Sequence, residues 1–375
     1  MLKKSYKFID LFSGCGGFSK GLELAGHKCL LGIDFKKEAV QSFKRNHPDA
    51  HALHMDIHEL TKKELVKYID INNIDLVVGG PPCQGFSTVG RGNVDDGRNS
   101  LFQQFVRVVK ITRPKIVLFE NVTGLLASKN TKVLHDIFSS FEKLGYQMDV
   151  KVMSAEMYGV PSRRRRAIIM GVRGGQPLFP KPISKSVQEK SIVKFALEDL
   201  KTKGGKLHNH DIEKAKVSNK LDLERLKKIP SGAGIRYQKD EKAYLPKKLR
   251  YDVNWNEINE GRFRQTKLQR LPWDKPSPTI LTSRTTYYHP IEHRHLTVRE
   301  AAKLQSFPNN FVFEGSLTAQ FRQIGNAVPP SLAKEIGKAI KKVEFDQKKV
   351  VKFTLDQREK VLKEAFAYKT KSVAG

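Results

Sequence analysis

Apolar residues follow two alternating patterns along the first half of the chain. Short, nearly continuous apolar runs indicate buried strands, and longer stretches with apolar residues three or four positions apart indicate amphipathic helices. The predicted strands are Tyr6–Phe12, Lys28–Ile33, Ile74–Val78, Lys115–Phe119, Gln147–Ser154 and Ala167–Val172. The predicted helices are Phe18–Ala25, Lys36–Asn46, Ser100–Thr112 and Val133–Leu144. Strands that alternate with helices predict an open α/β sheet, in which ligands lie at the carboxyl ends of the strands.

The pattern changes near Lys185. From there to Pro290 the apolar residues show little period, and Lys, Arg, Gly, Asn and Tyr are frequent. The stretch contains both tryptophans of the chain, Trp255 and Trp273, and the segment PSPTILT, which argue against a solvated linker. We interpret it as a second domain of short strands and loops.

Periodic helices return towards the end of the chain. Leu296–Gln305 contains the capping box Thr297 to Glu300, and a Gly/Pro turn at Gln323–Pro330 leads into a helix at Ser331–Val343. A second capping box, Thr354 to Gln357, predicts a helix to about Lys369. The predicted domains are residues 1–184 completed by 321–345, residues 185–320, and a basic C-terminal helix, 346–375.

The charge of the chain adds an expectation about its partner. There are 68 Lys and Arg against 39 Asp and Glu among 375 residues, a formal net charge of +29. Such an excess of positive charge indicates a polyanionic partner, and nucleic acid is favoured over a membrane surface. The alternative is a lysine-rich solvated surface, which would give the same net charge. No apolar run approaches the roughly 20 residues of a membrane span, and the start, MLKKSYKFIDLFSG, lacks the features of a signal peptide. We therefore expect an intracellular location.

The stretch VVGGPPCQGFS carries the first candidate for chemistry. Cys83 follows a predicted strand and two prolines, which fix the backbone beside the thiol. The three cysteines, Cys15, Cys29 and Cys83, lack the spacing of a disulfide framework or a zinc site, so we expect no metal. A lone cysteine is more often buried and inert, but Cys83 lies where open sheets keep their ligands.

Two features around the first two strands predict a nucleotide-type pocket. Ser13-Gly14-Cys15-Gly16-Gly17 breaks the first strand before a helix, so the backbone can approach a ligand there, although its spacing is not G-x-G-x-x-G. Asp34 ends the second strand beside Phe35, where a carboxylate can accept from ribose hydroxyls and a ring can stack on adenine. The alternative for Asp34 is a helix N-cap, and the same alternative applies to Asp56, which could hold an adenine amino group.

A carboxylate and several arginines complete the predicted constellation. Glu120 ends the strand Lys115–Phe119, on the sheet edge predicted for Cys83. Arg163 to Arg166 precede a strand and should alternate between its faces, so one face could hold a carbonyl or a phosphate. A thiol, a carboxylate and arginines beside an adenosine-type pocket suggest that a thiolate activates an electrophilic ring for group transfer from an adenosyl cofactor.

Six peptides, in this order and spacing, resemble one known family. DLFSGCGG, GGPPCQGFS, ENV, GVPSRRRR, RHLTVREAAKLQSFP and QIGNAVPP are similar to the motifs of DNA cytosine-5 methyltransferases of the bacterial restriction–modification type. The resemblance covers roughly Lys7 to Val343, although the middle third matches in position rather than in sequence. One departure is Ser162, where the family commonly has Gln, which puts in doubt any contact assigned to that position.

The resemblance implies a doubly wound, Rossmann-like sheet that binds S-adenosylmethionine, with residues 185–320 as a smaller, mostly-β target-recognition domain. It implies that duplex DNA lies between the two and that the target cytosine is flipped out of the stack. The cofactor-binding residues implied are Phe12, Ser13, Gly14, Gly16, Gly17, Asp34, Phe35, Asp56, Ile57, Pro81, Asn326 and Val328. The enzyme is then expected to be a cytoplasmic, nucleoid-associated monomer, with a cognate restriction endonuclease as a genetic rather than physical partner.

The resemblance also assigns catalytic roles. Cys83 attacks carbon 6 of cytosine, Glu120 hydrogen-bonds the ring nitrogen and exocyclic amine, and Arg166 holds the carbonyl oxygen with Arg164 in support. The base that removes the proton from carbon 5 is not identified by the sequence.

The expected DNA contacts lie in two parts of the chain. Ser87 and Arg91 belong to the loop after Cys83, and Arg262, Arg264, Gln265 and Arg284 are the candidate base readers of the second domain. Arg and Gln pair with guanine and adenine edges in the major groove.

Three other functions fit parts of the sequence less well. One branch of the family methylates tRNA, but that branch carries a different tripeptide after its ENV-like region and has a shorter recognition segment. A catalytically inactive DNA-binding relative would not need Cys83, Glu120 and Arg166 together. A nicotinamide dehydrogenase would explain the glycine loop and Asp34 but not PPCQ.

Overall fold

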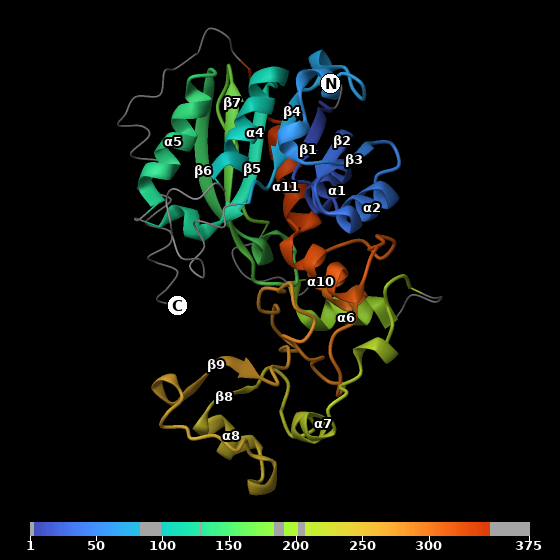
Figure 1. Cartoon of the computed structure of the whole chain (residues 1–375), viewed down its shortest axis with the longest axis vertical. Coiled ribbons are helices and arrows are strands. Elements are labelled where there is room, and N and C mark those ends of the chain that lie inside the picture. The colour runs from blue at the N-terminus through green and yellow to red at the C-terminus, as the bar shows by residue number, and fades with distance from the viewer. Residues whose placement is uncertain (1–3, 83–98, 128–129, 184–190, 202–206, 346–375) are drawn as a thin grey trace. The chain divides into compact units, whose positions relative to one another are not determined.

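The structure is a computed structural model that describes residues 4–82, 99–127, 130–183, 191–201 and 207–345 (Figure 1). The chain divides into two compact units. The first comprises Met1–Tyr158, Arg165–Ile183 and Ala327–Gly375, and the second comprises Gly159–Arg164 and Ser184–Asn326. The predicted helix in 346–375 lies outside the described residues.

A seven-stranded sheet forms the centre of the first unit, in the order β3-β2-β1-β4-β5-β7-β6. Its strands are β1 (Lys7–Leu11), β2 (Lys28–Asp34), β3 (His51–His54), β4 (Leu76–Gly79), β5 (Ile116–Val122), β6 (Tyr146–Ser154) and β7 (Arg165–Arg173). β1 to β5 are parallel, and β7 runs antiparallel to both of its neighbours. The strand order reverses between β1 and β4, and such a reversal is where open α/β sheets bind ligands.

Helices cover both faces of this sheet. They are α1 (Gly17–Leu24), α2 (Lys37–Asn46), α3 (Lys62–Leu65), α4 (Asn99–Thr112), α5 (Thr131–Glu142) and α11 (Pro330–Ile340). Rings of α4 and α5 pack on Phe119 of β5, whereas Ser19 of α1 contacts Asp10 on the other face of β1. Gly21 lets α1 approach α11 closely, because a Cβ there would lie 2.3 Å from that of Ala333. The predicted doubly wound α/β sheet is confirmed.

Sequence-based boundaries were close for most of these elements, but the end of β5 was wrong and two short elements, β3 and α3, were not predicted. β5 continues to Val122, so Glu120 lies within the strand instead of after it. The short α3 was not predicted, because one turn of helix offers too few positions for a periodic signal.

The second unit contains one small sheet and several short helices. β8 (Ile235–Tyr237) pairs antiparallel with β9 (Arg262–Lys267). The helices are α6 (Val193–Lys201), α7 (Lys220–Leu226), α8 (Gln238–Tyr244), α9 (Val298–Leu304) and α10 (Leu317–Asn326). Short 3₁₀ turns occur along the chain at η1 (Ile57–Glu59), η2 (Ile71–Asn73), η4 (Thr123–Leu126), η6 (Ala155–Tyr158), η8 (Glu213–Ala215), η9 (Lys247–Leu249) and η10 (Asn259–Gly261). Within its described residues the unit therefore consists mainly of loops and short helices and has one two-stranded sheet, rather than being mostly β.

Two local predictions in this part of the chain had different outcomes. The capping box of α9 is present, with Thr297 and Glu300 in its two roles. The turn predicted at Gln323–Pro330 was wrong for its first half, because Gln323 to Asn326 form the last turn of α10. Gly325 serves close packing there, since a Cβ would lie 2.6 Å from the backbone nitrogen of Thr282.

The buried carboxyl of Asp10 makes the stability of the fold depend on pH. Asp10 is 1% exposed, and the Ser19 hydroxyl donates to it at 2.6 Å. Burial, with a smaller effect from the charge of Asp34, raises the pKa of Asp10 from 3.8 to about 7. Between pH 3.8 and about 7 the folded protein keeps a proton on Asp10 that the unfolded chain releases, so the free energy of unfolding falls as pH rises.

We therefore expect Asp10→Asn to flatten the pH dependence of stability. Urea unfolding of the parent should lose up to about 1.4 kcal/mol per pH unit from this group between pH 4 and 7. The difference between parent and variant should change across that window and become constant above it. If the two stability curves run parallel from pH 4 to 8, Asp10 titrates normally in the folded protein.

Candidate active site

The functional candidates of the first unit gather at one edge of the sheet. β1, β2, β4 and β5 are parallel, so their carboxyl ends lie at the same edge, and the antiparallel β7 begins there (Figure 1). β1 and β2 bring the glycine loop and Asp34 to this edge. β4, β5 and β7 bring Pro81, Glu120 and Arg166.

The glycine loop is held in place by Asp34 and His47 and leaves open space beside Gly14. Phe12, Gly14 and Gly16 have φ of 59°, 55° and 90°, which explains the glycines at two of these positions. The Gly14 N–H donates to Asp34 Oδ2 at 2.9 Å. A Cβ at Gly16 would lie 2.2 Å from His47 Nε2, whereas a Cβ at Gly14 would meet nothing within 4 Å. Space for a ligand thus lies beside Gly14.

Ser13 and Gly17 complete the loop. The Ser13 N–H donates to the Ile33 carbonyl at 2.9 Å, which ties the loop to β2. Gly17 is buried and begins α1.

The Asp34 carboxylate has a structural function in this part of the fold. Its Oδ1 accepts from the Lys36 N–H at 2.9 Å while Oδ2 accepts from Gly14, so one carboxylate joins β2 to the glycine loop. Burial raises the pKa of Asp34. It is not the N-cap of α2, which is Lys36.

An aromatic ring and a second carboxylate flank Asp34. The Phe35 side chain is 60% exposed at the end of β2, under the ammonium of Lys36 at 4.3 Å. Asp56 caps η1, where its Oδ1 accepts from the His58 N–H at 2.9 Å, and this bond lowers the pKa of Asp56. Ile57 beside it is buried. An exposed ring and two carboxylates at the ends of the neighbouring strands β2 and β3 are suited to a planar base and a hydroxylated sugar.

Glu120 and Asn121 lie against the segment that leads to Cys83. The Asn121 amide donates to the Pro81 carbonyl at 3.3 Å, and a Cβ at Gly80 would lie 3.7 Å from Glu120 Oε2. Cys83 itself, with Ser87 and Arg91, lies outside the described residues. Sequence analysis did not assign Asn121 a function, although its place in ENV next to Glu120 was the available signal.

The four arginines alternate as predicted. Arg163 and Arg165 are exposed, whereas Arg164 is buried and Arg166 is half-buried. Arg166 Nε forms an ion pair with Glu120 Oε1, and both side chains are largely shielded from solvent. β7 and β5 therefore place a guanidinium directly beside the carboxylate.

Arg164 and Ser162 belong to the second unit. Arg164 Nη1 donates to the Gly325 carbonyl at 2.8 Å, at the end of α10. The Ser162 hydroxyl donates to the Pro278 carbonyl at 3.1 Å, so the residue that departs from the family pattern is buried in a local bridge. Asn326 is the exposed last residue of α10, and Val328 is buried just before α11.

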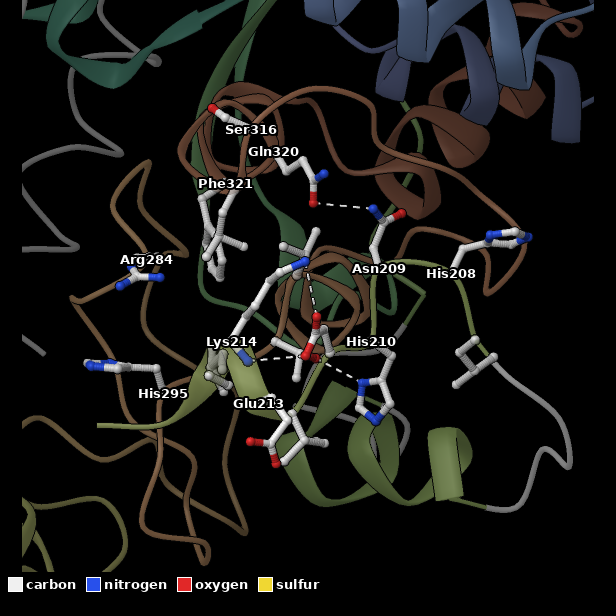
Figure 2. A pocket seen from close by; sticks show the side chains of 18 of the residues that line it. His208, Asn209, His210, Glu213, Lys214, Arg284, His295, Ser316, Gln320 and Phe321 are labelled. Atoms are coloured by element: carbon white, nitrogen blue, oxygen red, sulfur yellow. Dashed lines mark hydrogen bonds and ion pairs between the residues drawn. The ribbon is translucent and has the colours of Figure 1, made fainter. Parts of the chain in front are cut away.

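The four candidate base readers do not form one cluster. Arg264 and Gln265 are exposed on β9, and Arg262 at its start pairs with Glu260 Oε2 at 3.0 Å. Arg284 instead lines a cavity of about 1070 Å³ within the second unit, on the side of His295 (Figure 2). Burial and the nearby Arg284 lower the pKa of His295.

Two kinds of feature are absent from the residues that the structure describes. No group of three or more His, Cys, Asp or Glu side chains there could hold a metal ion. None of the helices in the same part of the chain is long and apolar enough to cross a membrane.

Comparison with known proteins gives one consistent result. The family model described as C-5 cytosine-specific DNA methylase matches residues 6–342. The type II methyltransferase M1.HphI of Haemophilus parahaemolyticus is 38% identical over 92% of this chain and 88% of its own length. M.DdeI of Desulfomicrobium norvegicum is 33% identical, with 88% of both chains covered. A crystal structure of a prophage-encoded E. coli protein, described as a DNA modification methyltransferase, has a TM-score of 0.64 and 27% identity, and covers 90% of this chain and 98% of its own.

Proposed function

The chain belongs to the family of C-5 cytosine-specific DNA methylases, and we propose that it methylates carbon 5 of a flipped-out cytosine through a covalent Cys83 adduct. It is a DNA (cytosine-5)-methyltransferase of the type found in type II restriction–modification systems. The observation that carries the proposed mechanism is the Glu120–Arg166 pair beside the Gly80–Pro82 segment.

The family as a whole uses S-adenosylmethionine. The first unit fits this cofactor, because Gly14 faces open space and Phe35 presents an exposed ring. We propose that Phe12, Ser13, Gly14, Gly16 and Gly17 hold its amino-acid part, that Asp34 accepts from the ribose, and that Phe35, Asp56 and Ile57 contact the adenine. Pro81, Asn326 and Val328 complete this set. When bound, the cofactor supplies an electrophilic methyl group.

The chemistry of the chain's own residues begins at Cys83. Its thiolate adds to carbon 6 of cytosine, and the electron pair of the 5,6 double bond moves to carbon 5. Glu120 hydrogen-bonds ring nitrogen 3 and the exocyclic amine, which stabilises the negative charge that the attack delocalises onto the ring.

Arg166 fits the neighbouring atom of the same ring. The carbonyl oxygen of cytosine is bonded to the carbon next to nitrogen 3, so a carboxylate and a guanidinium side by side match the two positions. Because Arg166 already pairs with Glu120, substrate binding needs little rearrangement of either side chain. We propose that Arg164 does not contact the cytosine. Instead it supports Arg166 by holding the chain segment before β7 through its hydrogen bond to the Gly325 carbonyl.

We propose that the second unit reads the DNA sequence. Arg264 and Gln265 are exposed on β9, and a two-stranded β-ribbon fits the major groove. Arg284 contributes from a separate loop. Ser87 and Arg91 are proposed to contact DNA beside the flipped cytosine.

The direct test of this function is transfer of a tritiated methyl group from labelled S-adenosylmethionine. Duplex DNA, tRNA and an assay without nucleic acid should be compared, followed by sequencing of the methylated cytosines. We expect label in duplex DNA only, at cytosines within one sequence. Label in tRNA alone would assign the enzyme to the RNA-methylating branch instead.

DNA binding should weaken steeply with salt. The formal charge of +29 implies that several lysines and arginines displace counterions from phosphates. We expect log affinity to fall linearly with log salt concentration, with a slope of about −0.9 for each phosphate neutralised. Fluorescence anisotropy of a labelled duplex between 50 and 300 mM salt measures it, and a slope near zero would show that the positive charge does not serve DNA binding.

A further inference from the structure

The paired ends of β8 and β9 carry a cluster of side chains that sequence analysis did not recognise. Tyr237 is the last residue of β8 and pairs with Arg262, the first residue of β9. The Tyr237 side chain is 37% exposed, and Lys239 Nζ lies 5.6 Å from the centre of its ring. Arg236 precedes Tyr237, so two arginines, a lysine and a phenol share the end of one ribbon.

The backbone of this ribbon end is fixed. Asp240 Oδ2 accepts from the N–H groups of Arg236 at 3.0 Å and Tyr237 at 2.9 Å, which forms the capping box of α8. The next residue of β9 is Phe263. Its ring packs edge-on against that of Trp255 in the core of the unit, with the ring centres 4.7 Å apart. Anchoring on both strands holds the cluster in one arrangement before any ligand arrives.

The electrostatics favour an anion. Arg236 and Arg262 lower the pKa of the Tyr237 hydroxyl, with Arg236 as the larger cause, and Arg262 pairs with Tyr237 across the ribbon. Glu260 Oε2 forms an ion pair with Arg262 Nη2 at 3.0 Å, although the Glu260 side chain is 71% exposed. Glu260 has φ of 55°, which is uncommon for a residue with a side chain and places its carboxylate beside the guanidinium. An exposed carboxylate therefore occupies a position that another anion could take.

We propose that Arg236, Tyr237 and Arg262 form a clamp for one phosphodiester of duplex DNA, with Glu260 as its occupant in the free protein. The proposal rests on the proposed function, in which the second unit binds duplex DNA. It reassigns Arg262 from base reading to positioning and leaves Arg264 and Gln265, farther along β9, as the base readers.

A phosphate matches this cluster better than a base edge does. Arg262 pairs with Tyr237 across the ribbon and Arg236 precedes Tyr237, so two guanidiniums and a phenol lie at one end of the ribbon, and a phosphodiester presents two charged acceptor oxygens to such donors. A base edge would leave the third donor group without an acceptor of its own. Contacts to phosphate fix the register of a protein on DNA, so a clamp at the ribbon end would set which base pairs Arg264 and Gln265 reach.

The test compares variants by affinity, salt dependence and sequence preference. Arg236→Ala, Arg262→Ala, Tyr237→Phe and Glu260→Gln are measured against the full-length parent, with Arg45→Ala on α2 as a charge-matched control. Anisotropy uses one duplex with the methylated sequence and one without it, and a randomised duplex pool reports preference. Melting temperatures confirm that each variant is folded.

We expect each arginine variant to lose about fivefold to tenfold in affinity for both duplexes alike at 100 mM salt. Each salt slope should become shallower by about 1, and the preferred sequence should stay unchanged. Tyr237→Phe should lose about threefold, and Glu260→Gln should gain affinity for both duplexes. Arg45→Ala should leave the salt slope as in the parent.

Three results would overturn the clamp. Relaxed preference at one position in Arg262→Ala would make Arg262 a base reader. Losses no larger than that of Arg45→Ala would remove the cluster from the interface. Weaker binding by Glu260→Gln would show that the carboxylate supports the site instead of occupying it. If the parent itself fails to bind or methylate duplex DNA, the proposed function fails, which is a separate outcome.

Discussion

Cys83→Ser should abolish methyl transfer, with a rate loss on the order of 10⁴-fold or more, as when a covalent nucleophile is removed. A serine hydroxyl at neutral pH is almost entirely protonated, so it adds to an unactivated ring far more slowly than a thiolate does. The measurement is single-turnover transfer of tritiated methyl to a duplex that contains the methylated sequence. Affinity for DNA and for the cofactor should change little, since both bind through other residues.

The other two cysteines provide the matched control. Cys15 and Cys29 are buried, and burial raises the pKa of the Cys15 thiol to about 12 and that of Cys29 well above its ordinary value. Both thiols therefore stay protonated and enclosed. Cys29→Ala in β2 should keep the parent's rate. A Cys83→Ser enzyme with near-normal turnover would remove the thiol from the mechanism.

The sheet was predictable because its strands are locally encoded. β1, β2, β4 and β5 are apolar on both faces, and the core residues Ile9, Leu31, Val77 and Val117 come from these four runs. The placement of Glu120 at the active edge followed from the same pattern, because neighbouring parallel strands end at one side. Its pairing with Arg166 was not predictable, because it depends on the antiparallel register of β7 against β5.

The second unit was harder to predict because buried arginines, rather than apolar periodicity, stabilise much of it. Arg270 donates to the carbonyls of His289, Glu292 and Leu226, and Arg299 donates to those of His208 and Pro308. Apart from the Arg299–Pro308 bond, these bonds join residues 19 to 91 positions apart, which is farther than the window of a periodicity pattern reaches. Arg270 and Arg299 are both buried, so these two arginines stabilise the fold and do not face solvent.

Arg262 illustrates the same limit at the level of single residues. Its spacing with Arg264 and Gln265 predicted one group of base readers. In the structure Arg262 is held by Glu260, and Arg284 lies on a separate loop beside His295. The residue types needed for recognition can be identified from the sequence, whereas the proposed division between phosphate contact and base contact depends on neighbours that only the fold supplies.

Glu120→Gln separates a catalytic carboxylate from a structural one. Glutamine keeps a side-chain oxygen that can accept from Arg166 Nε, so β5 and β7 should remain paired and the melting temperature should change little. The amide cannot donate a proton to ring nitrogen 3 as a carboxylic acid does, and it carries no charge to stabilise the exocyclic amine. We expect the rate of methyl transfer to fall by about 10²- to 10³-fold, the range for loss of a positioned acid or donor.

The control is a second glutamate that is also ion-paired. Glu64→Gln on α3 breaks a surface pair with Lys67, and such pairs contribute little to stability. It should leave the rate, the cofactor affinity and the melting temperature as in the parent. Cofactor affinity of Glu120→Gln, measured by calorimetry, should also match the parent, because Glu120 lies on β5 and the proposed cofactor residues lie mainly at β1 and β2. If instead Glu120→Gln lowers the melting temperature by many degrees and its rate loss follows the fraction unfolded, Glu120 is a structural partner of Arg166 and the acid must be another group.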